Sequence, residues 1–346
     1  MFALLLQSLL ACTVSAQEHG PFTPDFVQFL NSNPKRNEGM LEVFNEYGST
    51  GTFGGKQEGD EEIIRQPVIF VHGNSDSALF HSNLATGWTR HVEYFKSKGY
   101  NSGELYGMTY GDRNLTNAIH NRISCKNIIG LRRLIEAVLA YTQAEKVDII
   151  AHSMGVTLAR KAIQGGQAML TEELCDIGES ISDKIDTIVG ISGANRGMCL
   201  CLIPLMKDAN ACSAVDGFFP GTCKSPNANY EQCGKEFASC EKKDYATILK
   251  TVELIEDGEA DFVASLWSKD DEVLGMNNIA WGEKTSVIPN SHFTFEYQGL
   301  SHDKTKTETI MDQYALVTRH SRNAATIHTP SRARRSHTRK HHKHQH

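Results

Sequence analysis

The segment from Val147 to Ile163 constrains the fold of this chain more than any other. Val147–Ala151 is a run typical of a buried strand, and a helical pattern begins at Met154 and ends before Gly165-Gly166. A strand that passes into a helix across two residues is half of a strand–helix–strand unit. Such units require a parallel sheet on which the helix packs.

The rest of the body repeats this alternation. Short apolar or β-branched runs predict further strands at Val68–Val71, Glu104–Tyr110, Ile185–Ile191, Phe262–Leu266 and Phe293–Tyr297. Helical periodicity predicts helices at Phe80–Lys98, at Asn127–Gln143 and at about Thr305–Thr318. The pattern predicts an α/β fold, in which helices cover both faces of a mainly parallel sheet.

The 346 residues suffice for one large domain or two small ones. We expect residues 17–66 to form a polar, loop-rich N-terminal extension and residues 67–318 to form the α/β domain. Residues 199–240 contain six cysteines and interrupt the alternation. We therefore expect a disulfide-stapled insertion after the strand Ile185–Ile191, at the end of the sheet where ligands bind, where it could act as a cap.

The two ends of the chain differ from the body. Residues 1–16 are mostly apolar and end in small residues, which indicates a cleaved signal peptide; a buried N-terminal helix is the alternative. Residues 319–346 carry eight lysines or arginines, no acid and seven of the fifteen histidines, which predicts a disordered basic tail. The whole chain has a net charge of −6, so residues 1–318 carry −14. An acidic body argues against nucleic acid as a partner.

Eight cysteines remain once Cys12 is removed with the signal peptide. An even number favours four disulfides and therefore a secreted, extracellular protein. A zinc site is the alternative, but the cluster contains neither a Cys-x2-Cys pair nor a histidine. The sequon Asn114-Leu115-Thr116 marks Asn114 as a candidate glycosylation site.

Ser153 lies at the junction between the strand and the helix of the first segment. Small residues, Ala151 and Gly155, stand two positions before and two positions after it. This is close to the Gly-x-Ser-x-Gly nucleophile elbow, in which a strained turn exposes the serine hydroxyl and crowding excludes larger neighbours. Ala151 replaces the first glycine. The alternative is an ordinary serine cap at the start of a helix.

A second feature lies upstream, where Phe70–Asn74 ends the first strand of the domain with His-Gly-Asn. In hydrolases with a nucleophile elbow, the loop at this point supplies one backbone N–H of the oxyanion hole, and the residue after the nucleophile supplies the other. This nominates the amides of Asn74 and Met154. We interpret His72 and His152 as structural residues.

A serine hydrolase of this type needs an acid and then a histidine after the serine in chain order. Asp270, Asp271 and Glu272 follow the strand Phe262–Leu266, where the acid is expected, and all three fit. His302 follows the last strand in a loop, whereas His292 precedes that strand. We therefore predict His302 as the general base. The predicted chemistry is an attack of Ser153 on an ester carbonyl, and it requires no metal or organic cofactor.

Three segments together resemble the class 2 lipases: Val68–Asn74, Ala151–Gly155 and Gly193–Gly197. The resemblance covers about residues 67–320, and Ala-x-Ser-x-Gly is a form of the elbow found in that family. It implies an α/β-hydrolase fold and hydrolysis of acylglycerols or other carboxylic esters. The family's Ser-x-x-Asp stretch matches Ser268–Asp271, which implies Asp271 as the acid. The cysteine-rich insertion departs from the compact bacterial members, which lack a lid.

The predicted partner is a lipid or another ester, and peripheral contact with a lipid interface is a further hypothesis. Apolar residues of the insertion could form that interface or only the insertion's own small core: Leu200, Leu202, Ile203, Pro204, Leu205, Met206, Phe218 and Phe219. A non-catalytic lipid-binding or adhesive protein, an acyltransferase and a thioesterase are the competing functions. The sequence does not indicate an oligomeric state.

Overall fold

The computed structural model describes residues 19–34, 37, 46–224, 231–235, 240, 243–253 and 258–322. The predicted signal peptide, residues 1–16, and residues 323–346 of the predicted tail lie outside the described residues. Within the described part of the chain, no helix is long and apolar enough to cross a membrane.

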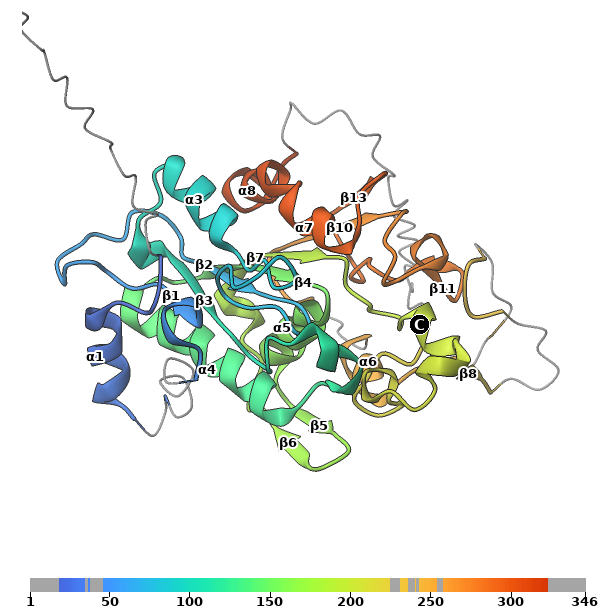
Figure 1. The fold of residues 1–346 in the computed structure, drawn as a ribbon. Helices are drawn as coiled ribbons and strands as arrows, with labels where there is room; N and C mark the ends of the chain where they lie inside the picture. The colour runs from blue at the N-terminus through green and yellow to red at the C-terminus, as the bar shows by residue number, and fades with distance from the viewer. Residues whose placement is uncertain are drawn as a thin grey trace, which may run out of the picture.

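A seven-stranded sheet forms the centre of the molecule, in the order β1-β3-β2-β4-β7-β10-β13 (Figure 1). Its strands are β1 (Thr52–Phe53), β2 (Val68–Val71), β3 (Leu105–Met108), β4 (Val147–His152), β7 (Ile185–Ile191), β10 (Phe262–Ser268) and β13 (Phe293–Tyr297). All neighbours are parallel except β1, which runs antiparallel to β3 at the edge. The predicted mainly parallel sheet is confirmed.

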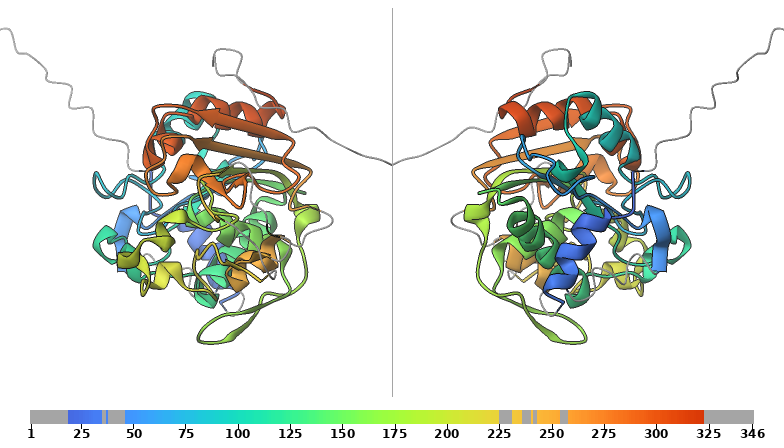
Figure 2. Two further views of the ribbon diagram at one scale, coloured as in Figure 1. Left: turned by 90° about the vertical axis from the view of Figure 1, so that its right-hand side faces the viewer. Right: turned by 90° about the vertical axis from the view of Figure 1, so that its left-hand side faces the viewer.

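Helices cover both faces of this sheet (Figure 2). Their bounds are α1 (Pro24–Ser32), α3 (Thr89–Ser97), α4 (Cys125–Thr142), α5 (Met154–Gln164), α6 (Thr247–Glu253), α7 (His302–Thr307) and α8 (Ile310–Arg319). Side chains alternate across each strand, so Ile69 and Val71 pack with α4 and α5, while Val68 and Phe70 pack with α3. Burial on both faces explains why these strands are continuous apolar runs.

The N-terminal segment belongs to the same core. Phe26 and Leu30 of α1 are fully buried in the cluster that contains α4, and β1 adds a strand to the sheet edge. Small two-stranded ladders lie outside the main sheet: β5 (Gln167–Met169) with β6 (Leu174–Asp176), β8 (Thr222–Cys223) with β9 (Lys243–Asp244), and β11 (Ile279–Ala280) with β12 (Glu283–Lys284).

Two predicted helices differ from the structure. Of the predicted helix Phe80–Lys98 only α3 forms, because the chain turns at Gly87, where φ is +55° and a Cβ would overlap the backbone of Leu79. The predicted helix Thr305–Thr318 is broken into α7 and α8. The threonine-rich junction favours the break, because the Thr309 hydroxyl bonds the carbonyl of Thr305.

The cysteine-rich insertion contains little regular structure. Its described residues form 3-10 turns, η5 (Cys199–Leu202), η6 (Pro204–Met206) and η7 (Asn210–Cys212), together with β8. The insertion closes on itself through the disulfides Cys199–Cys233, Cys201–Cys212 and Cys223–Cys240, and Cys125–Cys175 ties α4 to β6. The four predicted disulfides are therefore confirmed.

The first residues of the predicted tail are part of the body. Arg319 ends α8, and the imidazole of His320 lies 2.9 Å from the carboxylate of Asp186 and stacks on Phe262 with 4.5 Å between ring centres. The predicted boundary at residue 319 is therefore placed too early, because the described chain packs on the sheet beyond it.

Candidate active site

The strand β4 passes into α5 through Ser153, whose φ of +54° and ψ of −126° are strained for a residue with a side chain. Two glycines explain the turn. A Cβ at Gly155 would overlap the carbonyl oxygen of His72, and a Cβ at Gly73 would lie 2.9 Å from that of Ser153. The elbow thus has the crowding that the sequence pattern predicts, and its geometry goes beyond an ordinary helix cap.

His302 and Asp271 meet at the carboxyl ends of the strands. Asp271 follows β10, and His302 is the first residue of α7, whose N-cap is Ser301. The Nδ1 atom of His302 lies 2.8 Å from Oδ2 and 3.0 Å from Oδ1 of Asp271. His302 was expected in a loop, but α7 begins at His302, because the hydroxyl of Ser301 caps the helix by accepting the N–H of Lys304.

The three candidate acids have different partners. Asp270 accepts a hydrogen bond from the amide of Gly299 at 2.6 Å, and Glu272 accepts one from the amide of His302 at 2.9 Å. Asp271 is the one whose carboxylate bonds the imidazole of His302. The residues alone left open which of the three carboxylates is the acid, and the structure distinguishes them by their hydrogen-bond partners.

The carboxylate of Asp271 is almost fully buried, with 2% exposure. Burial would raise its pKa, but the nearby imidazole of His302 and the amide of Leu274 lower it, and the pKa lies below its ordinary value. The carboxylate is therefore charged at neutral pH. A proton on Nδ1 of His302 bonds this charge and leaves Nε2 as the acceptor.

The two predicted oxyanion donors, Asn74 and Met154, line one pocket together with Ser153 and His302. Met154 is the first residue of α5, so its N–H has no acceptor within the helix and lies at the positive end of the helix dipole. The side chain of Asn74 anchors the loop instead: its Nδ2 donates to the carbonyl of Ala118 at 2.8 Å.

His72 fixes the loop that carries Asn74. Its Nδ1 lies 2.7 Å from the carbonyl of Gly73, its Nε2 accepts the amide N–H of Tyr110 at 3.0 Å, and the two rings stack at 4.1 Å. Burial lowers the pKa of His72 to about 4, so the ring is neutral at physiological pH. These contacts agree with its interpretation as a structural residue.

His152 is buried beside Ser153. Its Nε2 lies 3.2 Å from the carbonyl oxygen of His302, and the two rings pack with 4.7 Å between centres. Burial and the neighbouring His302 lower its pKa well below the usual value. His152 therefore supports the backbone at the start of α7 as a neutral residue.

A pocket of about 240 Å³ opens beside these groups. Its remaining lining is apolar: Leu115, Ala118, Ile119, Ala194, Met198, Leu200, Met206, Ala211, Phe218, Val273 and Leu274. Four of these residues belong to the cysteine-rich insertion, and three belong to the 3-10 helix η3 (Leu115–His120). The insertion thus forms one wall of the pocket, as its predicted place after β7 suggests.

Sequence reasoning missed the wall formed by η3. Leu115 and Ile119 are also partly exposed, at 47% and 44%. Asn114, the candidate glycosylation site, is exposed and caps this helix by accepting the N–H of Thr116 at 3.1 Å. The sequence signal for this wall is the pair Leu115 and Ile119, two apolar residues four positions apart in a largely polar segment.

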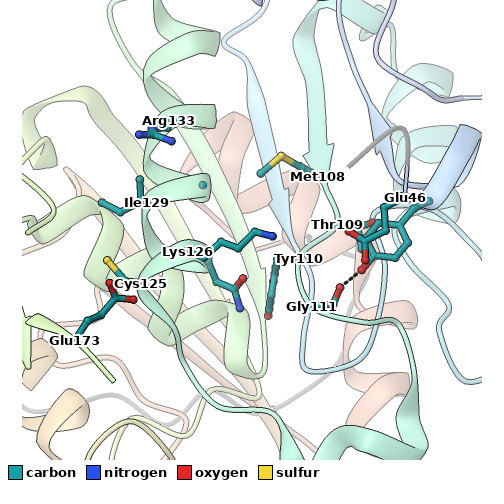
Figure 3. Close-up of a pocket in the computed structure, with 13 residues that line it drawn as sticks. Glu46, Met108, Thr109, Tyr110, Gly111, Cys125, Lys126, Ile129, Arg133 and Glu173 are labelled. Carbon is teal, nitrogen blue, oxygen red and sulfur yellow. Dashed lines mark hydrogen bonds between the residues drawn. The ribbon is translucent and has the colours of Figure 1, made fainter. Parts of the chain in front are cut away.

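A second cavity, of about 540 Å³, lies between α4 and the end of β3 (Figure 3). Its charged lining residues are Lys126, Arg133, Glu46 and Glu173, so neither sign of charge dominates. Among the described residues, no group of three or more His, Cys, Asp or Glu side chains is placed to hold a metal ion.

Comparisons with known proteins were made on sequence and on structure. The family model for lipase (class 2) matches residues 65–315. The chain is similar in fold to Bacillus licheniformis lipase BlEst2 in mature form, with 13% identity over 77% of this chain and 98% of that chain and a TM-score of 0.46. It is also similar to Aspergillus fumigatus lipase B, with 13% identity over 77% of this chain and a TM-score of 0.44, and spans about half of that protein, 53%.

Proposed function

This chain belongs to the class 2 lipase family, and we propose that it is a secreted serine hydrolase that cleaves carboxylic esters of lipids. We assign Ser153 as the nucleophile, His302 as the general base and Asp271 as the orienting acid. The observation that carries the proposal is the bond between His302 and Asp271 at the same pocket as the strained Ser153.

The reaction proceeds in two halves. Nε2 of His302 takes the proton of Ser153 as Oγ attacks the ester carbonyl, and the negative oxygen is held by the amides of Asn74 and Met154. Each such donor contributes about 3–4 kcal/mol in comparable sites. The alcohol leaves with the proton from His302. Water then attacks the acyl-enzyme by the same route and releases the acid and free Ser153.

The lining supports an ester with an apolar acyl chain. Leu200, Met206 and Phe218 offer the chain an apolar wall, and few polar atoms compete with it. The same insertion also presents apolar side chains to solvent, with exposures between 40% and 91%: Leu202, Ile203 and Leu205. This exposed apolar surface supports peripheral contact with a lipid interface.

Secretion is supported by the chemistry of the cysteines. Four disulfides persist in an oxidising compartment, which agrees with a signal peptide at residues 1–16. In that compartment the exposed Asn114 is our candidate acceptor for an N-linked glycan.

The test is an esterase assay on the full chain, secreted from a eukaryotic host, beside Ser153→Ala. We expect kcat to fall roughly 10⁶-fold in this variant, and we expect a fluorophosphonate to label the wild type on Ser153. Ser97→Ala, at an exposed serine of α3, is the control and should keep full activity.

Other results of these assays would support one of the competing functions. A wild-type protein that neither hydrolyses soluble and emulsified esters nor reacts with the fluorophosphonate would be a non-catalytic lipid-binding or adhesive protein. Acyl products formed with added alcohols in place of free acid would make it an acyltransferase, and selective cleavage of thioesters would make it a thioesterase.

A further inference from the structure

The proposed oxyanion loop and the proposed base come from distant parts of the sheet. The loop of Asn74 follows β2, whereas His302 begins α7 after β13. The strands β4, β7 and β10 lie between β2 and β13, and the four strand-to-strand spacings of about 4.8 Å place β2 and β13 roughly 19 Å apart. Asn74 and His302 nevertheless line the same pocket, so contacts between their segments outside the sheet also bear on their relative position.

A buried ion pair makes such a connection. Nζ of Lys306 lies 2.6 Å from Oδ2 of Asp76 and 2.8 Å from the hydroxyl of Thr86, and 3.1 Å from Oδ1 of Asp303. The other oxygen of Asp76 accepts the amide N–H of Gly87 at 2.9 Å. Lys306 is 0% exposed and Asp76 is 7% exposed. The segment that was predicted to be helical supplies two of these partners.

Each partner lies close to a proposed active-site residue in the chain. Lys306 is four residues after His302, one turn along α7, and its carbonyl accepts a bond from the Nε2 amide of Gln313 at 2.7 Å. Asp76 is two residues after Asn74, and its amide donates to the carbonyl of Gly73 at 3.3 Å. A shift at either end of the ion pair would therefore move a group at the pocket.

The carboxylate of Asp76 keeps its charge despite burial. Burial would raise the pKa of Asp76, but Lys306 outweighs this and holds the pKa below its ordinary value. Stability alone does not explain such a pair, because apolar replacements of buried ion pairs are often neutral or stabilising. The pair joins α7 to the loop that carries Asn74, and this position offers another reason for its presence.

We propose that Lys306 and Asp76 are positioning residues that hold α7 and His302 against the loop of Asn74 for ester hydrolysis. This inference rests on the proposed function. A misplacement of about 1 Å can cost roughly 10²-fold in rate, so the pair acts on kcat through the geometry of the base and of the oxyanion donor, without touching the substrate.

The buried pair Arg160–Glu259 provides a matched control. Its side chains are 1% and 2% exposed, and Arg160 also bonds Asn195 and the carbonyl of Val252, none of which belongs to α7 or to the loop of Asn74. Asp76→Asn and Glu259→Gln each neutralise the carboxylate of a buried ion pair with little change of shape. Both variants should lower the thermal midpoint of unfolding.

The experiment compares kcat, KM and the rate of fluorophosphonate labelling of Ser153 in the secreted chain. We expect Asp76→Asn to lower kcat and the labelling rate by roughly 10²-fold with little change in KM, and Glu259→Gln to keep both near the wild-type values. Lys306→Arg should recover part of the loss seen in Lys306→Met. Equal losses in Asp76→Asn and Glu259→Gln, or wild-type kcat in Asp76→Asn, would overturn the inference.

Two further arms keep the test decisive. If Asp76→Asn does not fold, Thr86→Val removes one hydrogen bond of Lys306 and should give a smaller fall in kcat; no fall would contradict the proposal. If the wild type hydrolyses no ester, the proposed function fails, and the labelling rates of the same variants still test the positioning role. A wild type that is not labelled either would overturn both proposals.

Discussion

The central sheet and the cysteine-rich insertion contribute to the same pocket by different physical means. Ser153 directly follows β4, and Asp271 lies three residues after the end of β10; both strands are buried on both faces. The insertion instead presents Leu200, Met206 and Phe218 from 3-10 turns and loops that its disulfides close. With the proposed function, the difference corresponds to a division of labour, in which the sheet fixes the proposed reacting groups and the insertion shapes the space proposed for the substrate.

The division has an energetic basis. A strand of a buried parallel sheet is held by ladder hydrogen bonds and by apolar contacts on two sides, so the residue after it is placed accurately. A short loop segment has too little apolar area to define its own conformation, and disulfides restrict it chiefly by lowering the entropy of the unfolded chain. Substitutions on the sheet side should therefore change kcat, whereas those in the insertion should change substrate preference.

Among the substitutions that test this division of labour, Asp271→Asn should have the largest effect. The amide keeps the shape of the side chain but stabilises the wrong tautomer of His302, and in a comparable triad this costs roughly 10⁴-fold in kcat. Ester hydrolysis at saturating substrate measures the loss. Asp270→Asn, one residue away and bonded to the amide of Gly299, is the control. Activity retained in the first variant and lost in the second would assign the acid to Asp270.

The sheet was predictable from the sequence because its strands are continuous apolar runs. Ile185–Ile191 and Phe293–Tyr297 were predicted with the bounds that the structure has. The elbow at Ser153 was recognisable because steric crowding leaves a local pattern of small residues. Chain order led to His302, since it reflects how parallel strands bring their carboxyl ends together.

The remaining parts depend on contacts between distant segments. The choice among Asp270, Asp271 and Glu272 is decided by which carboxylate faces His302, and the residues alone left it open. The segment before α3 looked helical, but its Gly87 takes a positive φ and its Thr86 bonds Lys306, more than two hundred residues away. No local pattern encodes such a partner.

Phe218→Ala tests the insertion side of the comparison. The residue is 5% exposed and lines the pocket, so its removal should change the ratio of kcat/KM between long-chain and acetyl esters by about 1–3 kcal/mol, or 10–200-fold. Cleavage of the acetyl ester should persist. Phe219→Ala, at the neighbouring residue outside the pocket lining, should leave the ratio unchanged.

A loss of stability could obscure this result, because a buried Phe→Ala change costs about 3–5 kcal/mol. Phe218→Leu gives a milder enlargement and should shift the ratio in the same direction. If both variants lower kcat equally for every ester, the insertion holds the catalytic groups in place and the division of labour is wrong.

Lowering the pH should reduce the free energy of unfolding through His72, which follows β2 of the sheet. The pKa of His72 is lowered to about 4 in the folded chain, so the unfolded chain binds more protons between about pH 6.5 and pH 4. Stability from this group is complete above pH 6.5 and is lost as the pH falls toward 4, by about 1.4 kcal/mol per pH unit. Urea unfolding at several pH values measures this slope. His72→Gln should reduce it, whereas His120→Gln, at an exposed residue of η3, should not.

The smallest effect should come from Leu205→Ser, because Leu205 is 91% exposed and its side chain is not part of the pocket lining. Removing an apolar side chain that faces solvent leaves the free enzyme almost unchanged but weakens adsorption to an apolar surface, by only part of the roughly 1.5–3 kcal/mol that full burial of a leucine provides. Hydrolysis of a soluble ester should therefore stay constant while hydrolysis of an emulsified ester falls. Leu174→Ser, at an exposed leucine of the β5–β6 hairpin, should change neither rate. If the two variants behave alike on the emulsion, the insertion shapes the pocket but does not contact the lipid surface.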